Sequence, residues 1–228
     1  MKKITIPMPK KLRERVDNYT NCLLTPDGFK YLIEENEVYI KGFKKGNPTE
    51  IPAYIENMPV VYLAGLHHLP LSGEVRIPDT VRELEWAVFN VQESATKFII
   101  PESVIRIDEH AFAWCKSLEE ILFPDSVTEL GIGTVMSCKK LKSVHLPANL
   151  FSIPGYFASG CTALEEIFIP AHVVRIEEMA FNDCSALKQI QLPDNLKYIG
   201  KYAFAGCTSL KLPVIPEGCE VHPKAFHD

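Results

Sequence analysis

The sequence predicts an α/β solenoid, in which similar coils stack and each coil holds a short strand, a turn and a short helix or 3₁₀ turn. Two repeating patterns lead to this prediction. Seven prolines recur every 23 residues from Pro78 to Pro216, and five cysteines keep the same period. A constant period of this size is typical of stacked structural units rather than of one globular topology. The cysteines are Cys115, Cys138, Cys161, Cys184 and Cys207.

The composition fits a folded domain and argues against a nucleic-acid binder. Of the 228 residues, 46% are hydrophobic and 23% are charged, and the net charge is −5. A protein that binds nucleic acid carries a basic footprint, so we expect no nucleic acid among the partners. Basic residues do gather near the N-terminus, but a solvated helix face explains them better than a site for an anionic partner. They are Lys2, Lys3, Lys10, Lys11, Arg13 and Arg15.

The sequence contains no apolar run near the roughly 18 residues that a membrane span needs. The N-terminus does not resemble a signal peptide either, because Pro7, Pro9 and Lys10 stand where an apolar segment is required. We therefore expect no membrane span and a cytoplasmic protein, or a cell-surface or secreted one if a leader has been removed.

Residues 1–24 precede the repeats and are expected to form an N-terminal helix or extension. Leu12, Val16 and Tyr19 would share one face of a short amphipathic helix. Residues 25–50 predict a hairpin cap, with strands over 29–33 and 38–42 joined by a polar turn. A cap is expected there because the first coil of a stack has an unpaired sheet edge and an uncovered core face.

The repeat domain spans 25–228, with repeats over 51–214 and a C-terminal cap over 215–228. In the unit 100–122, residues around Ile121 alternate as a strand must, and the following proline ends the strand because it has no N–H. Residues 109–114 suit a short helix or 3₁₀ turn on the opposite side. The positions expected to be buried between coils are Ile100, Val104, Ile107, Phe112, Cys115, Leu118 and Ile121.

These coils resemble the BspA-like (Treponema pallidum-type) leucine-rich repeats. The pattern runs Ile100-Pro101-Glu102-Ser103-Val104, then Ile107, Ala111-Phe112, Cys115, Ser117-Leu118 and Ile121. The sequence departs from this pattern in three units, with Gln92 and Ala95 in place of cysteine and leucine, Thr134-Val135 in place of Ala-Phe, and an aromatic residue one place early at Phe157.

The resemblance implies a right-handed, curved solenoid with a parallel sheet on its concave face and short helices or 3₁₀ turns on its convex face. It also implies binding of a protein or another ligand, often at bacterial cell surfaces. It supplies no catalytic residues.

The cysteines and histidines do not predict reactive chemistry. Zinc sites use closely spaced cysteine pairs, and a spacing of about 8–10 Å between packed helical turns would be too wide for disulfides. Small buried hydrophobic side chains are therefore the better interpretation of the cysteines. His67 and His68 lie in an irregular coil, where a metal role is the weaker interpretation. Without a nucleophile motif or a phosphate-binding loop, we expect no enzyme, no cofactor and no metal.

The outward face of the predicted sheet holds the candidate binding residues. Successive strands would place equivalent residues about 4.8 Å apart, in two columns. The apolar members have no core role in this register, so they either mark a contact surface or stack on one another as a cross-strand ladder. One column is Ile99, Leu122, His145, Phe168, Gln191 and Val214; the other is Lys97, Glu120, Ser143, Glu166 and Gln189.

We therefore predict a non-catalytic module whose concave sheet binds a protein or a peptide. The alternative is a cell-surface adhesin for a host protein or a carbohydrate, with Phe168, Tyr156 and His145 facing the sugar. A hydrolase that uses His145 is the remaining alternative. Self-association through the concave face or a terminal coil stays open, and the sequence does not identify the ligand.

Overall fold

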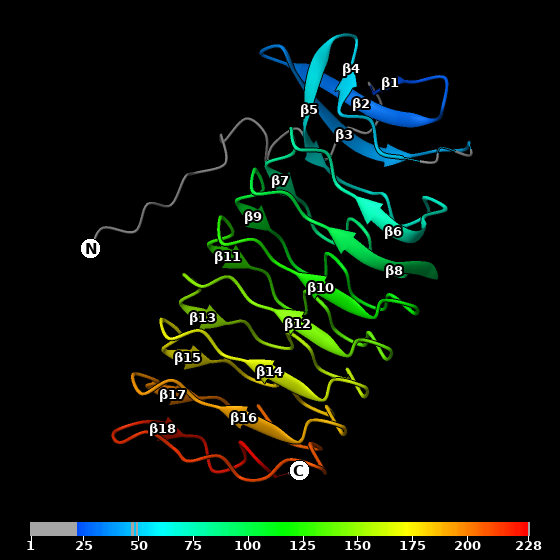
Figure 1. Ribbon diagram of the computed structural model, residues 1–228. Coiled ribbons are helices and arrows are strands. Elements are labelled where there is room, and N and C mark those ends of the chain that lie inside the picture. The colour runs from blue at the N-terminus through cyan, green and yellow to red at the C-terminus, as the bar shows by residue number, and fades with distance from the viewer. Residues whose placement is uncertain (1–21, 47, 49, 228) are drawn as a thin grey trace.

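The chain winds into a stack of coils in the computed structural model, which describes residues 22–46, 48 and 50–227 (Figure 1). Most coils contribute one strand to a main sheet and one two-residue strand to a second ladder. The main sheet comprises β6 (Ser72–Arg76), β8 (Ser94–Ile99), β10 (Glu120–Leu122), β12 (Ser143–His145), β14 (Glu166–Phe168) and β16 (Gln189–Gln191). The second ladder comprises β5 (Met58–Leu63), β7 (Glu83–Leu84), β9 (Arg106–Ile107), β11 (Glu129–Leu130), β13 (Ser152–Ile153), β15 (Arg175–Ile176), β17 (Tyr198–Ile199) and β18 (Glu220–Val221).

All strand pairs within the main sheet and within the second ladder are parallel. The predicted stack of parallel coils is therefore confirmed. The right hand and the curvature implied by the resemblance stay predictions.

The N-terminal strands form the hairpin that the sequence predicts. β2 (Phe29–Glu34) and β3 (Glu37–Phe43) pair antiparallel, and the positive φ values of Glu35 and Asn36 make the tight turn between them. β3 then pairs parallel with β5, which joins the hairpin to the second ladder. β1 (Leu23–Leu24) pairs with β2, and β4 (Tyr54–Ile55) pairs with β5.

The domain boundaries at 1–24, 25–50, 51–214 and 215–228 stay predictions. The predicted helix with Leu12, Val16 and Tyr19 lies outside the described residues. The end of that segment is described, and there Leu23–Leu24 is a strand.

The expected short helices or 3₁₀ turns do not form in any described coil, and this part of the α/β prediction is corrected. Residues 109–114 form hydrogen-bonded turns in which His110 and Trp114 both have φ of 56°. Left-handed residues four apart cannot continue a right-handed helix. The turn amides instead bond to the next coil, as where Phe112 N–H donates to Thr134 O at 2.9 Å. The described residues therefore form a solenoid of strands and turns.

The core between the two ladders is filled by apolar side chains at the predicted positions. Phe112, Cys115, Leu118 and Ile121 are all fully buried. A chain of phenylalanine rings runs along this core, with neighbouring centroids 4.8–6.3 Å apart. Its members are Phe89, Phe98, Phe112, Phe123, Phe157, Phe181, Phe204 and Phe226.

Both ladders are interrupted at the same place, between the coils 123–145 and 146–168. No pairing joins β12 to β14 or β11 to β13 among the described strands. The turns remain bonded there, because Val135 N–H donates to Phe157 O at 3.0 Å. These are the two coils whose sequences depart from the repeat at Thr134-Val135 and Phe157. We call this boundary the seam.

Candidate functional site

The strand register aligns the candidate residues into the predicted columns, except Val214, which lies outside the described strands. Ile99 pairs with Leu122, and Leu122 pairs with His145. On the C-terminal side of the seam, Phe168 of β14 pairs with Gln191 of β16. In the second column, Lys97 pairs with Glu120, Glu120 pairs with Ser143, and Glu166 pairs with Gln189. The seam thus divides each column into two pieces, which the sequence did not indicate.

The outward side chains of the columns are accessible to a partner. Leu122 is 48% exposed and Phe168 is 69% exposed, whereas the adjacent Ile121 and Ile167 are buried. Ile99 is half-buried, and Ser143, His145, Glu166, Gln189 and Gln191 are exposed. We call the surface made by Ile99, Leu122, His145 and Phe168, with their neighbours in the second column, the main-sheet face.

Two shallow cavities lie where the strands of this face run into the prolines. One has a volume of about 360 Å³ and is lined by Ile99, Leu122 and His145 together with Lys97 and Asp125. The other has a volume of about 290 Å³ and is lined by Phe168 and Gln191. The part of the first column on each side of the seam therefore borders a cavity with room for a side chain of a partner.

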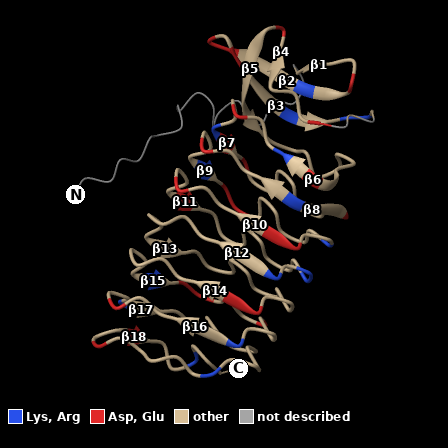
Figure 2. Cartoon of the chain, in the orientation of Figure 1, with Lys and Arg blue, Asp and Glu red and all other residues tan. Residues whose placement is uncertain are grey.

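The charge beside these cavities is mixed. Lys97 forms an ion pair with Glu120 across neighbouring strands, which neutralises that part of the second column. Glu166 is exposed on β14, on the far side of the seam. Figure 2 shows acidic residues on β10 and β14 and basic residues on β8 and the adjoining loops.

The cysteine ladder has a structural role. Each of the five periodic thiols donates a hydrogen bond of 3.0–3.2 Å to a carbonyl 26 residues earlier, in the preceding coil. Gln92, which replaces cysteine in its unit, donates through Nε2 to Leu66 O at 3.0 Å, also 26 residues earlier. All seven cysteines are free thiols. Burial raises the pKa of Cys161 to about 12, so this thiol does not ionise near neutral pH.

A group of charged and tyrosine side chains lies on β3, β5 and the residues just after β7. Lys41 Nζ lies 4.1 Å from the ring centroid of Tyr62, and burial lowers the pKa of Lys41. Burial, together with Glu85, raises the pKa of Tyr62. Lys41 Nζ and Tyr62 OH have no hydrogen-bond partner among the described residues. This arrangement restrains a lysine over an aromatic ring.

The histidines do not assemble a metal site in the described part of the chain. The rings of His67 and His68 contact each other at 4.1 Å between centroids. Over 22–46, 48 and 50–227, no group of three or more His, Cys, Asp or Glu side chains is placed to hold a metal ion. Among the same residues, no helix has the length and hydropathy needed to cross a bilayer.

The residues suggested for carbohydrate binding do not share one surface element. Phe168 and His145 lie on main-sheet strands. Tyr156 lies in a turn, where its N–H donates to Glu178 O of the next coil.

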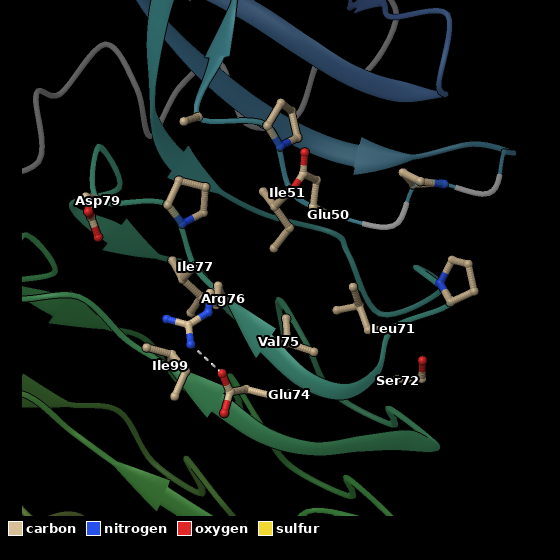
Figure 3. Close-up of a pocket in the computed structure, with 15 residues that line it drawn as sticks. Glu50, Ile51, Leu71, Ser72, Glu74, Val75, Arg76, Ile77, Asp79 and Ile99 are labelled. Carbon is tan, nitrogen blue, oxygen red and sulfur yellow. Dashed lines mark hydrogen bonds and ion pairs between the residues drawn. The ribbon is translucent and has the colours of Figure 1, made fainter.

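The repeat pattern did not predict a further cavity, which borders β6. It has a volume of about 870 Å³ and lies beside β6, at the first edge of the main sheet. Figure 3 shows Glu50 and Ile51 on one side of it and β6, with Val75 and Arg76, on the other. Strict periodicity begins only at Ile77, and this late start was the available signal that no described strand precedes β6 in the main sheet.

The sequence matches the BspA type leucine rich repeat region family over residues 71–163 and 152–228, in six copies. The solved structure of a Treponema pallidum leucine rich repeat protein is 27% identical with a TM-score of 0.70, covering 83% of this chain and 91% of that one. A leucine-rich repeat protein from Eubacterium ventriosum is 26% identical with a TM-score of 0.66, covering 88% of this chain and 50% of that one.

A third solved structure, of a leucine-rich repeat protein from Bacteroides ovatus, shares the fold at 24% identity, with a TM-score of 0.65 over 86% of this chain and 60% of that one. The chain thus spans 50% and 60% of the lengths of the Eubacterium and Bacteroides proteins. No curated protein sequence matches the chain.

Proposed function

Because the chain belongs to the BspA-type leucine-rich repeat family, we propose that it is a non-catalytic module whose main-sheet face binds another protein or a peptide. The family and the fold support binding in general, since leucine-rich repeat solenoids present extended surfaces. The place of binding is argued from the residues of this chain, because a fold alone does not specify a function.

The observation that carries the proposal is the exposure of apolar side chains on a hydrogen-bonded sheet. Leu122 is 48% exposed and Phe168 is 69% exposed. The cavity beside Leu122 is also lined by His145, and the cavity beside Phe168 is also lined by Gln191. Exposed apolar groups that border polar residues mark contact surfaces.

The alternative, in which these side chains only stack on one another, is weaker in this geometry. His145 stands between Leu122 and Phe168 in the column, and the seam separates His145 from Phe168. The two apolar side chains are therefore not cross-strand neighbours. A surface location and adhesion to a host protein or carbohydrate stay predictions of the family resemblance.

A crosslinking experiment tests the proposal. The photoreactive residue p-benzoylphenylalanine is placed at 168 on the main-sheet face and, as a control, at Phe151, which is 62% exposed outside the main sheet. We expect position 168 to capture a discrete partner from the native host and position 151 not to capture it. The double variant Leu122→Asp/Phe168→Asp should reduce pull-down of that partner about tenfold or more, as expected for central interface residues.

The matched control is Trp86→Asp/Phe151→Asp, which changes two exposed aromatic residues away from the main sheet. This control variant should retain the partner. Unchanged capture by the main-sheet variant, or equal loss in both variants, would remove the main-sheet face as the binding surface.

A further inference from the structure

The main sheet has an unpaired edge at β6. β6 pairs with β8 on one side, and no described strand pairs with its other side. An edge strand presents unpaired backbone N–H and C=O groups and can accept an additional strand. The coil before β6 does not supply that strand, since 50–53 carries no strand and Pro52 has no N–H to donate.

The direction of the unpaired groups follows from the bond made by Ile77. Its N–H donates to Ile99 O at 3.0 Å, on the β8 side. Backbone groups alternate in direction along a strand. The N–H of Arg76 and the carbonyls of Glu74 and Arg76 therefore point to the unpaired side.

The cavity beside this edge has an apolar wall and an acidic rim. The cavity has a volume of about 870 Å³. Its apolar wall is formed by the buried residues Ile51, Leu71, Val75 and Ile77. Exposed charged residues line the rim of the cavity. Among them, Arg76 Nη2 lies 2.6 Å from Glu74 Oε1 in an ion pair. Glu50 and Asp79 add two further acidic groups to the lining. Figure 3 shows Glu50, Glu74 and Asp79 among the side chains around this cavity. An extended segment with alternating apolar residues and a basic end would complement them.

Every main-sheet strand carries the same five-residue pattern: a polar residue, an apolar residue, any residue, an apolar residue and proline. The second and fourth residues face the core. The six copies are Glu74-Val75-Arg76-Ile77-Pro78, Lys97-Phe98-Ile99-Ile100-Pro101, Glu120-Ile121-Leu122-Phe123-Pro124, Ser143-Val144-His145-Leu146-Pro147, Glu166-Ile167-Phe168-Ile169-Pro170 and Gln189-Ile190-Gln191-Leu192-Pro193.

The same pattern occurs once near the N-terminus, as Lys3-Ile4-Thr5-Ile6-Pro7, preceded by Lys2. The stretch just before β6 matches it less well, because 48–52 begins with Pro48-Thr49 where the others have a polar and an apolar residue. The segment 8–21 separates Pro7 from the described chain and can span roughly 45 Å when extended.

We propose that residues 3–7 of the same chain add to the unpaired edge of β6 as a parallel strand and complete the main sheet. Ile4 then lies at the level of Val75, and Ile6 at the level of Ile77. The Arg76 N–H donates to Ile4 O, and the N–H groups of Ile4 and Ile6 donate to the carbonyls of Glu74 and Arg76. Lys2 and Lys3 meet the acidic rim.

Hydrogen exchange of individual amides, measured by NMR on the full chain, tests this proposal. The Arg76 amide should exchange slowly in the wild-type protein and about tenfold or more faster in Ile4→Asp/Ile6→Asp, because loss of a strand partner exposes it to solvent. Thr5→Asp is the matched control and should keep the protection, since residue 5 faces away from the core in this register. The amide of Leu122 reports that each variant is folded.

A peptide with the sequence of residues 2–8 supplies the second arm. Added to Ile4→Asp/Ile6→Asp, it should restore slow exchange of Arg76. The same peptide N-methylated at Ile4 should not restore it, whereas the peptide N-methylated at Thr5 should restore it fully, because the Ile4 amide faces β6 and the Thr5 amide faces away. Fast exchange of Arg76 in the wild-type protein, or restoration by all three peptides alike, would overturn the proposal. Protection that is lost on dilution to a monomer would show that a second copy supplies the strand and would overturn the intramolecular form.

Discussion

The structure explains why cysteine recurs every 23 residues between Cys115 and Cys207. Each thiol is small enough to be buried between coils and still donates to a carbonyl of the preceding coil. For Cys161 the acceptor is Val135 O, which also accepts the N–H of Cys138. The thiol thus occupies the second lone pair of a buried carbonyl. Gln92 makes the equivalent bond with a longer side chain, which explains how that unit tolerates the departure.

Alkaline pH should destabilise the protein through the buried thiol of Cys161. The pKa of Cys161 is about 12 in the folded chain, against an ordinary value of 9.0. Below pH 9 both states keep the proton; between pH 9 and 12 only the folded thiol keeps it, so ionisation stabilises the unfolded chain. The contribution of the Cys161 thiol to the free energy of unfolding is therefore full below pH 9. Above pH 9 the free energy of unfolding falls by up to about 1.4 kcal/mol per pH unit.

Urea unfolding at pH 8, 9.5 and 10.5 measures this effect. Cys161→Ala should lose less of its free energy of unfolding over this range than the wild-type protein loses. The same pH slope in both proteins would contradict the assignment to Cys161.

The short elements owe their form to hydrogen bonds between coils rather than within them. Ser137 and Asp183 occupy left-handed backbone positions in the turns, with φ of 59° each. A non-glycine residue in this region costs about 1 kcal/mol or more. The amides of these residues bond to the next coil, Ser137 N–H to Ser159 O and Asp183 N–H to Ala205 O, and these bonds offset the strain. An isolated coil would lack them.

Among the boundaries between main-sheet strands, the seam should give the backbone amides the least protection from hydrogen exchange. The Phe168 amide lies on the side of β14 that faces β12, where the pairing is missing, whereas Leu122 and Gln191 occupy the same position in paired strands. We expect Phe168 to exchange its amide hydrogen about tenfold or more faster than Leu122 and Gln191. Amide-resolved exchange at neutral pH measures this, and equal protection at the three positions would show that the seam is bonded in solution.

The whole molecule is connected by the chain of phenylalanine rings. Coils in a solenoid contact only their neighbours, so stability depends on each interface in turn. At the seam, where both ladders are interrupted, continuity depends on the turns and on the contact of Phe123 with Phe157, whose ring centroids lie 6.3 Å apart. Phe123 stands where other units carry isoleucine or leucine, and it also contacts Phe112 at 6.3 Å. It thereby bridges the unit in which Val135 replaces phenylalanine.

Phe157→Ala should uncouple the two parts of the stack. The loss of a fully buried phenylalanine costs about 3–5 kcal/mol. We expect urea unfolding, followed by circular dichroism, to change from one transition into two, because the coils on either side of the seam then unfold independently. Phe151→Ala, which removes an exposed ring in the same coil, is the control and should unfold like the wild-type protein. A single unshifted transition for Phe157→Ala would contradict this role.

The sequence by itself determined the repeat, the buried positions and the register of the columns. These features are local or periodic, so the spacing of Ile121, Cys138 and Pro147 is enough to place them. The pairing of Ile99 with Leu122 and of Leu122 with His145 follows from the same period. Whether the main-sheet face binds a partner stays a prediction.

Only the tertiary structure decided between helices and turns, located the seam and showed that β6 lacks a second partner among the described strands. The apolar spacing of Ile107, Phe112 and Cys115 fits either a helix or a turn, and the choice depends on hydrogen bonds to residues 22 positions away. The edge position of β6 among the described strands and the interrupted pairing at the seam are likewise properties of neighbouring coils. A local pattern cannot contain them, because they arise only when one coil is placed against the next.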